Sequence, residues 1–175
     1  ISDNPVSSNI IVNNKIGYEG TRNDKNEKHG YGICVYSNGD QRYEGCYKKG
    51  KMHGQGVYTY FNASVYEGTF VDNLKHGFGI YRYSTGAFYS GTWVNNKQEG
   101  KGSYQYPEGD IYEGDFYKGK MHGTGVYRYR NGNIYEGMFL DGQQDGKGVI
   151  KYSGGSEYEG EFRHGLMHGK GVYRY

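Results

Sequence analysis

Aromatic and glycine positions alternate with other residues over short stretches of this chain, and the pattern returns at a fixed interval. Tyrosines that precede Glu-Gly or Ser-Gly stand 23 residues apart, at Tyr43, Tyr66, Tyr89, Tyr112, Tyr135 and Tyr158. An earlier copy begins at Tyr18, 25 residues before Tyr43. A strict period of this length is typical of a repeat array, in which each unit buries its apolar face against its neighbours.

The copy over residues 66–88 shows what each unit is expected to form. Glycines and rings occupy every second position in two stretches, at Tyr66, Gly68 and Phe70 and then at Gly77, Gly79, Tyr81 and Tyr83. Alternation with period two predicts two β-strands. The polar segment 71–76 is expected to be the loop between them, and the segment around Thr85 a short return turn. Each repeat is therefore predicted to be an antiparallel β-hairpin.

One face of the predicted strands carries only glycines and rings. A glycine leaves bare backbone over which a neighbouring ring can lie, so the two residue types are expected to pack as a unit. The predicted fold is all-β: an elongated, single-layer solenoid of consecutive antiparallel β-hairpins, which sheet twist curls into a trough. Residues 18–175 make up seven repeats, and residues 1–17 are expected to be an N-terminal segment with a degenerate capping strand at 10–12.

Composition narrows the class of protein. The mean hydropathy of −0.95 is that of a disordered chain, but an aromatic fraction of 17% and 22 tyrosines indicate a folded one. A net charge of +2 without an arginine-rich block argues against a strongly basic surface that would bind nucleic acid. The two cysteines, Cys34 and Cys46, are expected to be free thiols in a reducing, cytoplasmic compartment.

Residues 112–129 carry Y-E-G-x-F followed by G-K-M-H-G-x-G-V-Y-x-Y, which resembles the membrane occupation and recognition nexus (MORN) repeat. The resemblance covers residues 18–175. It implies a solenoid of β-hairpins that serves as a scaffold, as in junctional membrane proteins, cytoskeletal components, lipid kinases and a lysine methyltransferase. The asparagine pairs Asn13-Asn14 and Asn95-Asn96 are similar to those of apicomplexan parasite proteins, which implies a MORN-only protein of the cell-division apparatus.

Histidines and glutamates recur once in most repeats, at His29, His53, His76, His122 and His168 and at Glu44, Glu67, Glu113, Glu136 and Glu159. Equivalent positions in neighbouring hairpins lie about 10 Å apart. That spacing is too long for a shared zinc ion, whose ligands lie about 2 Å from the metal, and for the close carboxylate pair of a retaining glycosidase. We therefore expect no catalytic residue, no metal, no cofactor and no enzymatic activity.

Two surfaces are candidates for binding. The first is a groove floored by rings, which suits a protein partner: Tyr60, Phe70, Tyr83, Trp93, Tyr106, Phe116, Tyr129, Phe139 and Tyr152. The alternative is that these rings only pack on glycine backbone and on each other. The second is a rim of lysines that could bind anionic phospholipid weakly: Lys48, Lys49, Lys51, Lys75, Lys118 and Lys120. The alternative there is a solvated rim that keeps the array soluble.

The last strand offers a third candidate, because an unpaired strand edge can pair with another chain. Tyr173, Arg174 and Tyr175 are expected to form the self-association edge of a homodimer. The predicted function is a scaffold for protein partners that also self-associates, in the cytoplasm, at the cortical or membrane-associated cytoskeleton or in cell division. The alternatives are a phospholipid-binding module and a regulatory repeat region of a larger enzyme.

Overall fold

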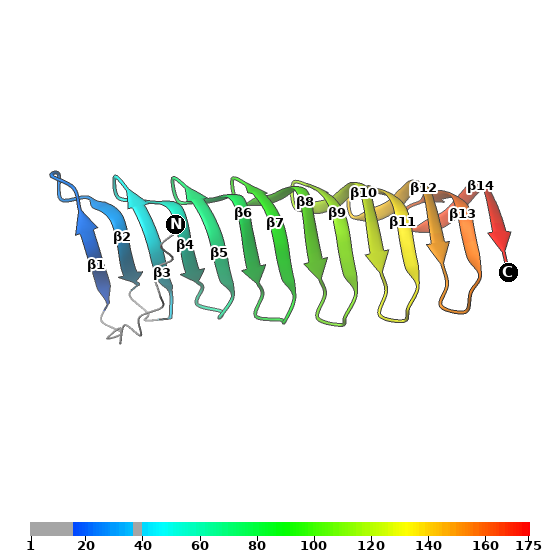
Figure 1. Cartoon of the computed structure of the whole chain (residues 1–175), viewed down its shortest axis with the longest axis horizontal. Helices are drawn as coiled ribbons and strands as arrows, with labels where there is room; N and C mark the ends of the chain where they lie inside the picture. The colour runs from blue at the N-terminus through cyan, green and yellow to red at the C-terminus, as the bar shows by residue number, and fades with distance from the viewer. Residues whose placement is uncertain (1–15, 37–39) are drawn as a thin grey trace, which may run out of the picture.

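The computed structural model describes residues 16–36 and 40–175, and the expected capping strand at 10–12 lies outside them. The described residues form one antiparallel sheet in which each strand pairs only with its neighbours in sequence (Figure 1). This confirms the predicted all-β hairpin array. The strands are β1 (Gly17–Arg22), β2 (Lys28–Val35), β3 (Arg42–Lys48), β4 (Lys51–Thr59), β5 (Val65–Val71), β6 (Leu74–Arg82), β7 (Phe88–Val94), β8 (Lys97–Gln105), β9 (Ile111–Tyr117), β10 (Lys120–Arg128), β11 (Ile134–Leu140), β12 (Gln143–Lys151), β13 (Glu157–Arg163) and β14 (Leu166–Arg174).

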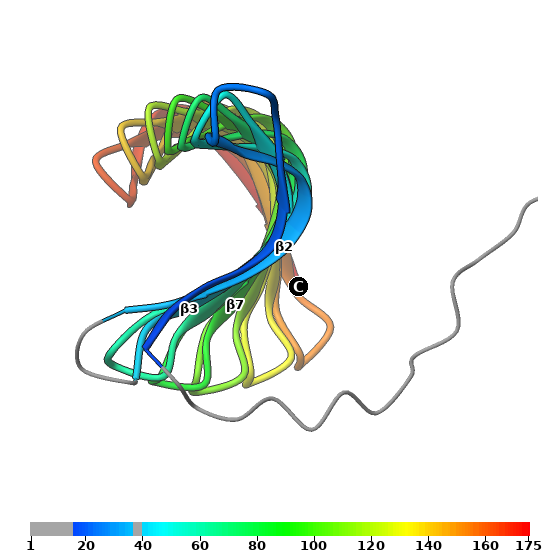
Figure 2. The same ribbon diagram turned by 90° about the vertical axis from the view of Figure 1, so that its left-hand side faces the viewer.

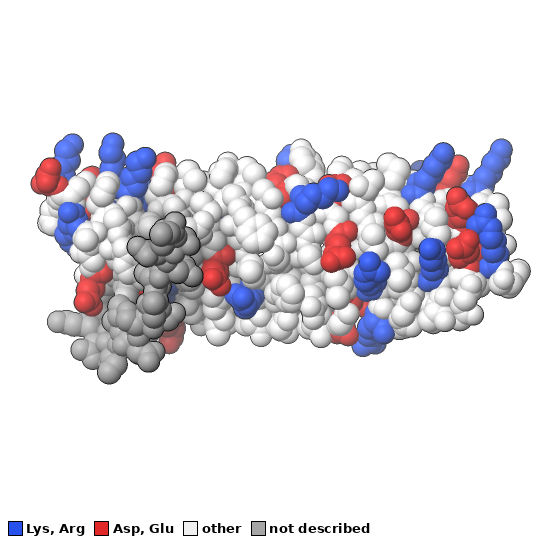
Figure 3. All heavy atoms as spheres, in the orientation of Figure 1, with Lys and Arg blue, Asp and Glu red and all other residues white. Residues whose placement is uncertain are grey.

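The strands bend along their length, so that the sheet forms an open trough when viewed down its long axis (Figure 2). Figure 3 looks onto the outer side of this bend, where Lys and Arg are interspersed with Asp and Glu. No second layer of described residues covers either face. Burial must therefore come from side chains that lie on the sheet itself.

A line of paired glycines crosses the sheet at its middle, with one glycine in each strand. The register places Gly68 opposite Gly79 within a hairpin and opposite Gly56 in the preceding one, and the same pairing continues from Gly20 in β1 to Gly171 in β14. The Tyr66 ring lies over this backbone: a Cβ built on Gly79 would fall 2.6 Å from the Cε2 and Cζ atoms of Tyr66. The Tyr66 hydroxyl then donates to the Thr69 carbonyl at 3.0 Å. The expected packing of rings on glycine is thus what the structure shows.

These tyrosines belong to a continuous chain of rings that we call the aromatic spine. Successive rings meet edge to face, with centroids 4.8–5.5 Å apart. Pairs of this kind contribute about 0.5–1.5 kcal/mol beyond their buried area. The spine runs through Tyr18, Tyr47, Tyr43, Phe70, Tyr66, Trp93, Tyr89, Phe116, Tyr112, Phe139, Tyr135, Phe162 and Tyr158, and all but Tyr18 are buried.

A second file of rings, which we call the tyrosine row, packs beside the spine and stays half exposed. Its neighbouring rings are tilted, with centroids 4.4–6.0 Å apart. Ile150 stands where the next tyrosine would be, and beyond it Tyr152, Tyr173 and Tyr175 continue the ring contacts. The tyrosine row consists of Tyr36, Tyr58, Tyr60, Tyr81, Tyr83, Tyr104, Tyr106, Tyr127 and Tyr129.

The connections differ from the sequence-based expectation, which placed a long loop at 71–76 and a short turn near Thr85. The first connection is a two-residue turn, Asp72-Asn73, with both φ angles positive, and the second spans residues 83–87. Lys75 and His76 are part of β6, which bulges so that residues 76–78 face Thr69 alone. Gly77, with φ of +66°, allows the bulge because a left-handed backbone disfavours side chains.

We expect Gly79→Val to destabilise the array far more than Glu67→Ala. The valine Cβ would overlap the Tyr66 ring, at a cost of about 3 kcal/mol for overpacking. Glu67 is exposed on the outer face and forms an ion pair with Arg82, at 3.3 Å, so its loss should cost about 0.5 kcal/mol. Urea denaturation followed by tyrosine fluorescence measures both variants. Equal losses would show that the ring does not need the bare backbone.

Candidate interaction site

The structure divides the nine predicted groove residues into two groups. Phe70, Trp93, Phe116 and Phe139 are buried in the aromatic spine. Tyr60, Tyr83, Tyr106, Tyr129 and Tyr152 are half-buried and line the trough beside the spine. The first four rings therefore only pack within the sheet, and the five tyrosines stay candidates for binding a partner.

Two depressions of about 260 and 270 Å³ open on the tyrosine row. The repeat-3 pit is lined by Tyr81 and Tyr83 with Trp93 behind them, and the repeat-5 pit by Tyr127 and Tyr129 with Phe139 behind them. Corresponding residues in the two pits are 46 positions, or two repeats, apart. Burial raises the pKa of Tyr83 to about 12, so its hydroxyl is a neutral hydrogen-bonding group at the mouth of its pit.

One position in each repeat, just before the histidine or its replacement, fills the slot between the spine and the tyrosine row. We call its occupants the slot residues: Lys28, Met52, Lys75, Gln98, Met121, Gln144 and Met167. Gln144 Nε2 donates to the Tyr129 hydroxyl at 2.7 Å, and Gln98 Nε2 to the Tyr83 hydroxyl at 3.4 Å. Sequence reasoning missed this position, although aligning the repeats on their histidines would have revealed a column of long, unbranched side chains.

Lys75 is the slot residue whose ammonium group lies against four rings, whereas that of Lys28 lies over two, Tyr18 and Tyr47. The Lys75 Nζ atom is 4.5 Å from the ring centre of Tyr81, 4.6 Å from Trp93, 5.6 Å from Tyr66 and 5.7 Å from Tyr60. Burial lowers the pKa of Lys75 to about 8, although the ring faces, which attract a cation, offset part of that effect. Lys75 was expected on the lysine rim, and the structure places it inside the trough instead.

The other five rim lysines are exposed at or beside the two-residue turns, where Lys49 and Lys118 occupy left-handed positions. Two of the five have acidic partners, because Lys51 Nζ is 3.6 Å from an Asp72 carboxylate oxygen and Lys120 Nζ is 3.2 Å from one of Asp141. The rim therefore carries charges of both signs rather than a uniformly basic surface.

Hollows also lie on the outer face, which was not among the candidate surfaces predicted from the sequence. Two adjoining depressions of about 590 and 570 Å³ follow the glycine line from β8 to β14. Lys101, Lys147 and Lys170 stand along their lining together with Glu113, Glu136 and Glu159, and Val126, Val149 and Val172 supply apolar surface. The hollows lie between the Lys, Glu and Val side chains that flank the glycine line on this face.

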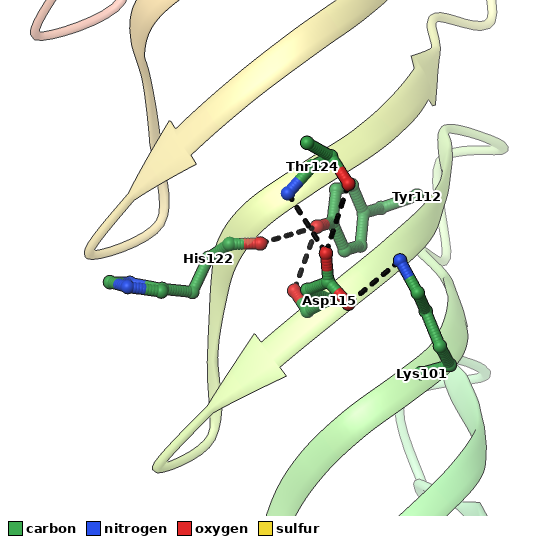
Figure 4. A network of polar contacts seen from close by, with 5 residues as sticks. All are labelled: Lys101, Tyr112, Asp115, His122 and Thr124. Carbon is green, nitrogen blue, oxygen red and sulfur yellow. Dashed lines mark hydrogen bonds and ion pairs between the residues drawn. The ribbon is translucent and has the colours of Figure 1, made fainter.

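A cluster of polar groups between β9 and β10 holds the bulge rather than forming a reactive centre (Figure 4). Asp115 accepts hydrogen bonds from the Thr124 amide at 2.9 Å and from Lys101, whose Nζ is 2.7 Å away. Burial acts to raise the pKa of Asp115, but these hydrogen bonds outweigh it and hold the pKa below its ordinary value. The backbone carbonyl of His122 accepts a hydrogen bond from the Tyr112 hydroxyl at 3.4 Å, while the His122 ring points away from the Asp115 carboxylate.

The histidine ladder brings no cluster of ligands together. Among residues 16–36 and 40–175, no three His, Cys, Asp or Glu side chains are placed to hold a metal ion. His53 Nδ1 lies 3.5 Å from an Asp72 carboxylate oxygen, which is an ion pair when the imidazole is protonated. The same ranges contain no helix long and apolar enough to span a bilayer.

The predicted self-association residues Tyr173 and Arg174 lie in β14, one of the two edge strands in the described part of the chain, and Tyr175 follows it. There β14 pairs with β13 alone, through Tyr173 opposite Tyr158 and Gly171 opposite Gly160. Every residue of β14 is exposed, including Leu166 at 72% and Val172 at 54%. Arg174 binds Glu157 at 2.8 Å and is therefore tied to the sheet.

We expect Lys75→Met to stabilise the array by about 1–2 kcal/mol at pH 7, because it removes a half-buried, unpaired cation from a slot that accepts methionine elsewhere. The folded pKa of Lys75, about 8, is below its unfolded value of 10.5. The ionisation of Lys75 therefore increases the free energy of unfolding of the native protein as pH rises from about 8 to 10.5. Over that range the difference in stability between the variant and the native protein should become smaller.

Denaturation curves at several pH values measure this difference, and the exposed Lys97→Met variant is the control. A Lys75→Met variant that is less stable than the native chain at pH 7 would show that the cation–ring attraction outweighs desolvation.

Comparisons with known proteins bear on the fold and the family. The TCP domain of SAS-4 (dCPAP) from Drosophila melanogaster, solved with a proline-rich motif of Ana2 (dSTIL), is 18% identical over 82% of this chain and 78% of that chain, with a TM-score of 0.49. The TCP10 domain of Danio rerio CPAP is 15% identical over 74% and 72%, with a TM-score of 0.28. Likenesses this distant carry no functional argument. No curated protein matches the chain.

The family comparison is decisive because it covers nearly all of the sequence that forms the sheet. The MORN repeat matches seven consecutive segments, at residues 24–41, 43–65, 66–88, 89–111, 112–134, 135–157 and 158–175. Six of them begin on a spine tyrosine that covers a glycine pair. The chain therefore belongs to the MORN repeat family.

Proposed function

We propose that this protein is a non-enzymatic scaffold that binds protein partners along the tyrosine row. The observation that carries the proposal is the pair of equivalent pits, two repeats apart, on a file of half-exposed tyrosines. Tyrosine offers a large apolar ring and a hydroxyl at a low entropic cost, which suits it to protein interfaces. A cortical or cell-division role in the cytoplasm follows from the family resemblance and belongs to the same proposal.

The spacing of the pits describes the kind of partner that fits. Each hairpin adds two strands and advances the sheet by about 10 Å, so the pits are about 20 Å apart. An extended segment spans that distance with about six residues, and a helix with about 13. A single linear segment with two apolar anchors can therefore occupy both pits at once.

We expect the double variant Tyr83→Ala and Tyr129→Ala to lose at least about tenfold in affinity for a partner, since each ring lines one pit. Photo-crosslinking residues at these two positions, introduced in the native cell, should capture the same protein. The matched controls are Val57 and Val149, which lie on the outer face. Equal capture from both faces, or a partner that binds the double variant undiminished, would contradict the proposal.

Self-association through β14 is proposed on the basis of its exposed apolar residues and single pairing partner. We expect light scattering to show a mass that rises from monomer to dimer with concentration. Leu166→Lys with Val172→Lys places charges on this strand and should keep the chain monomeric. A monomer at all concentrations, or a dimer that the lysines leave intact, would exclude this edge.

Weak association with anionic phospholipid is the alternative that the rim supports, because Lys48, Lys49 and Lys118 are exposed without an acidic partner among the ion pairs of the described residues. Each contributes about 1 kcal/mol at most near an acidic membrane. We expect vesicles containing phosphatidylserine to sediment the native chain but not a variant with Lys48, Lys49, Lys118 and Lys120 changed to Glu. Equal sedimentation of the two proteins would exclude the rim.

A further inference from the structure

The slot of repeat 3 differs chemically from the other slots that adjoin the tyrosine row. Met52, Gln98, Met121 and Gln144 are neutral, and the Gln98 and Gln144 amides donate to tyrosine hydroxyls of the row. Lys28 in the first repeat also lies over two rings, but its Nζ atom has a hydrogen-bond acceptor, Cys34 Sγ, at 3.2 Å. Lys75 alone combines a charged group with a slot that is built for neutral side chains.

Hydrogen bonds from the next repeat hold the backbone of Lys75 in place, and this directs its side chain into the slot. The Lys75 amide donates to Asn96 Oδ1 at 2.8 Å, and the Asn96 amide donates to the Lys75 carbonyl at 3.0 Å. Within residues 16–36 and 40–175, Nζ has ring faces around it and neither a carboxylate in ion-pair range nor a hydrogen-bond acceptor. An ammonium group in this setting loses water without gaining an acceptor for its three N–H bonds.

This environment makes Lys75 an amine that can act as a nucleophile near neutral pH. Desolvation favours the uncharged form, which carries the reactive lone pair. The repeat-3 pit, about 260 Å³ in volume, opens over the side chain, so a reagent can approach from the trough. Lys97 lines the same pit but is exposed, and therefore keeps the solvation of an ordinary surface lysine.

We propose that Lys75 is a site of N-acylation by acyl thioesters. The neutral amine attacks the thioester carbonyl carbon, a C–N bond forms, the C–S bond breaks, and the departing thiolate takes up the proton that the nitrogen loses. The products are an amide on Lys75 and a free thiol. The amide is neutral and can exchange hydrogen bonds with a tyrosine hydroxyl, as Gln98 and Gln144 do in their slots.

Acylation would change the surface of the trough at one defined place. It removes the caged cation from the repeat-3 pit and leaves the aromatic walls in place, while Lys97 still lines the same pit. The modified side chain also no longer carries a buried charge that opposes folding. The site therefore links the supply of acyl thioesters to the electrostatics of the tyrosine row.

The test is to incubate the folded chain with acetyl-coenzyme A at pH 7.5 and to measure the acetylation rate of each lysine by peptide mass spectrometry. We expect Lys75 to react about tenfold faster than Lys97, since a larger neutral fraction outweighs the lower nucleophilicity of a weaker base. In 8 M urea the two rates should become equal. The Lys75 rate should level off above about pH 8.

Two results would overturn the proposal. One is a Lys75 rate in the folded chain that is equal to or below that of Lys97, which would mean that the cage protects the amine. The other is a ratio of the Lys75 rate to the Lys97 rate that is unchanged by urea. That result would mean that the residues next to Lys75 in the sequence, and not the fold, cause its faster reaction. A Lys75→Gln variant that matches the stability of the acetylated chain would confirm that the slot accepts the neutral amide.

Discussion

The contact of a tyrosine ring with paired glycine backbone is the interaction on which the rest of the structure depends. A sheet without a second layer has no opposing side chains to bury, so it must cover itself. The glycine line provides a bare strip across every strand, and one tyrosine per hairpin lies over it. Edge-to-face contacts then join these rings from one repeat to the next, and the aromatic spine replaces the aliphatic core of a two-layer protein.

The sequence predicted the fold because the same device is repeated with a constant period. The alternation of glycines and rings identified the strands, and the spacing of the tyrosines identified the hairpins. The sequence-based prediction exchanged the lengths of the two connections, because Lys75 and His76 are polar and were therefore assigned to a loop. They lie in a bulged strand, and a bulge breaks the period-two pattern on which the assignment rested.

The candidate surfaces were predicted only in part, since a sequence pattern assigns a residue to a face but does not give its depth. Phe70 and Tyr83 share a face, yet Phe70 is in the spine and Tyr83 at the rim of a pit. Lys75 was grouped with the exposed lysines because its burial depends on Tyr81 and on Trp93, which lies in the next repeat. The outer hollows were missed because alternation assigns Lys, Glu and Val side chains to the outer face but does not show the space left between them.

The pairing of each strand with its neighbours in sequence has a consequence for how the protein is made. Every tertiary contact in the sheet closes a short loop, so little chain entropy is lost before contacts begin to form. An array of this kind can nucleate at any hairpin and grow outward from it. The first repeats can therefore assemble while later ones are still being synthesised on the ribosome, and each finished hairpin becomes the template for the next.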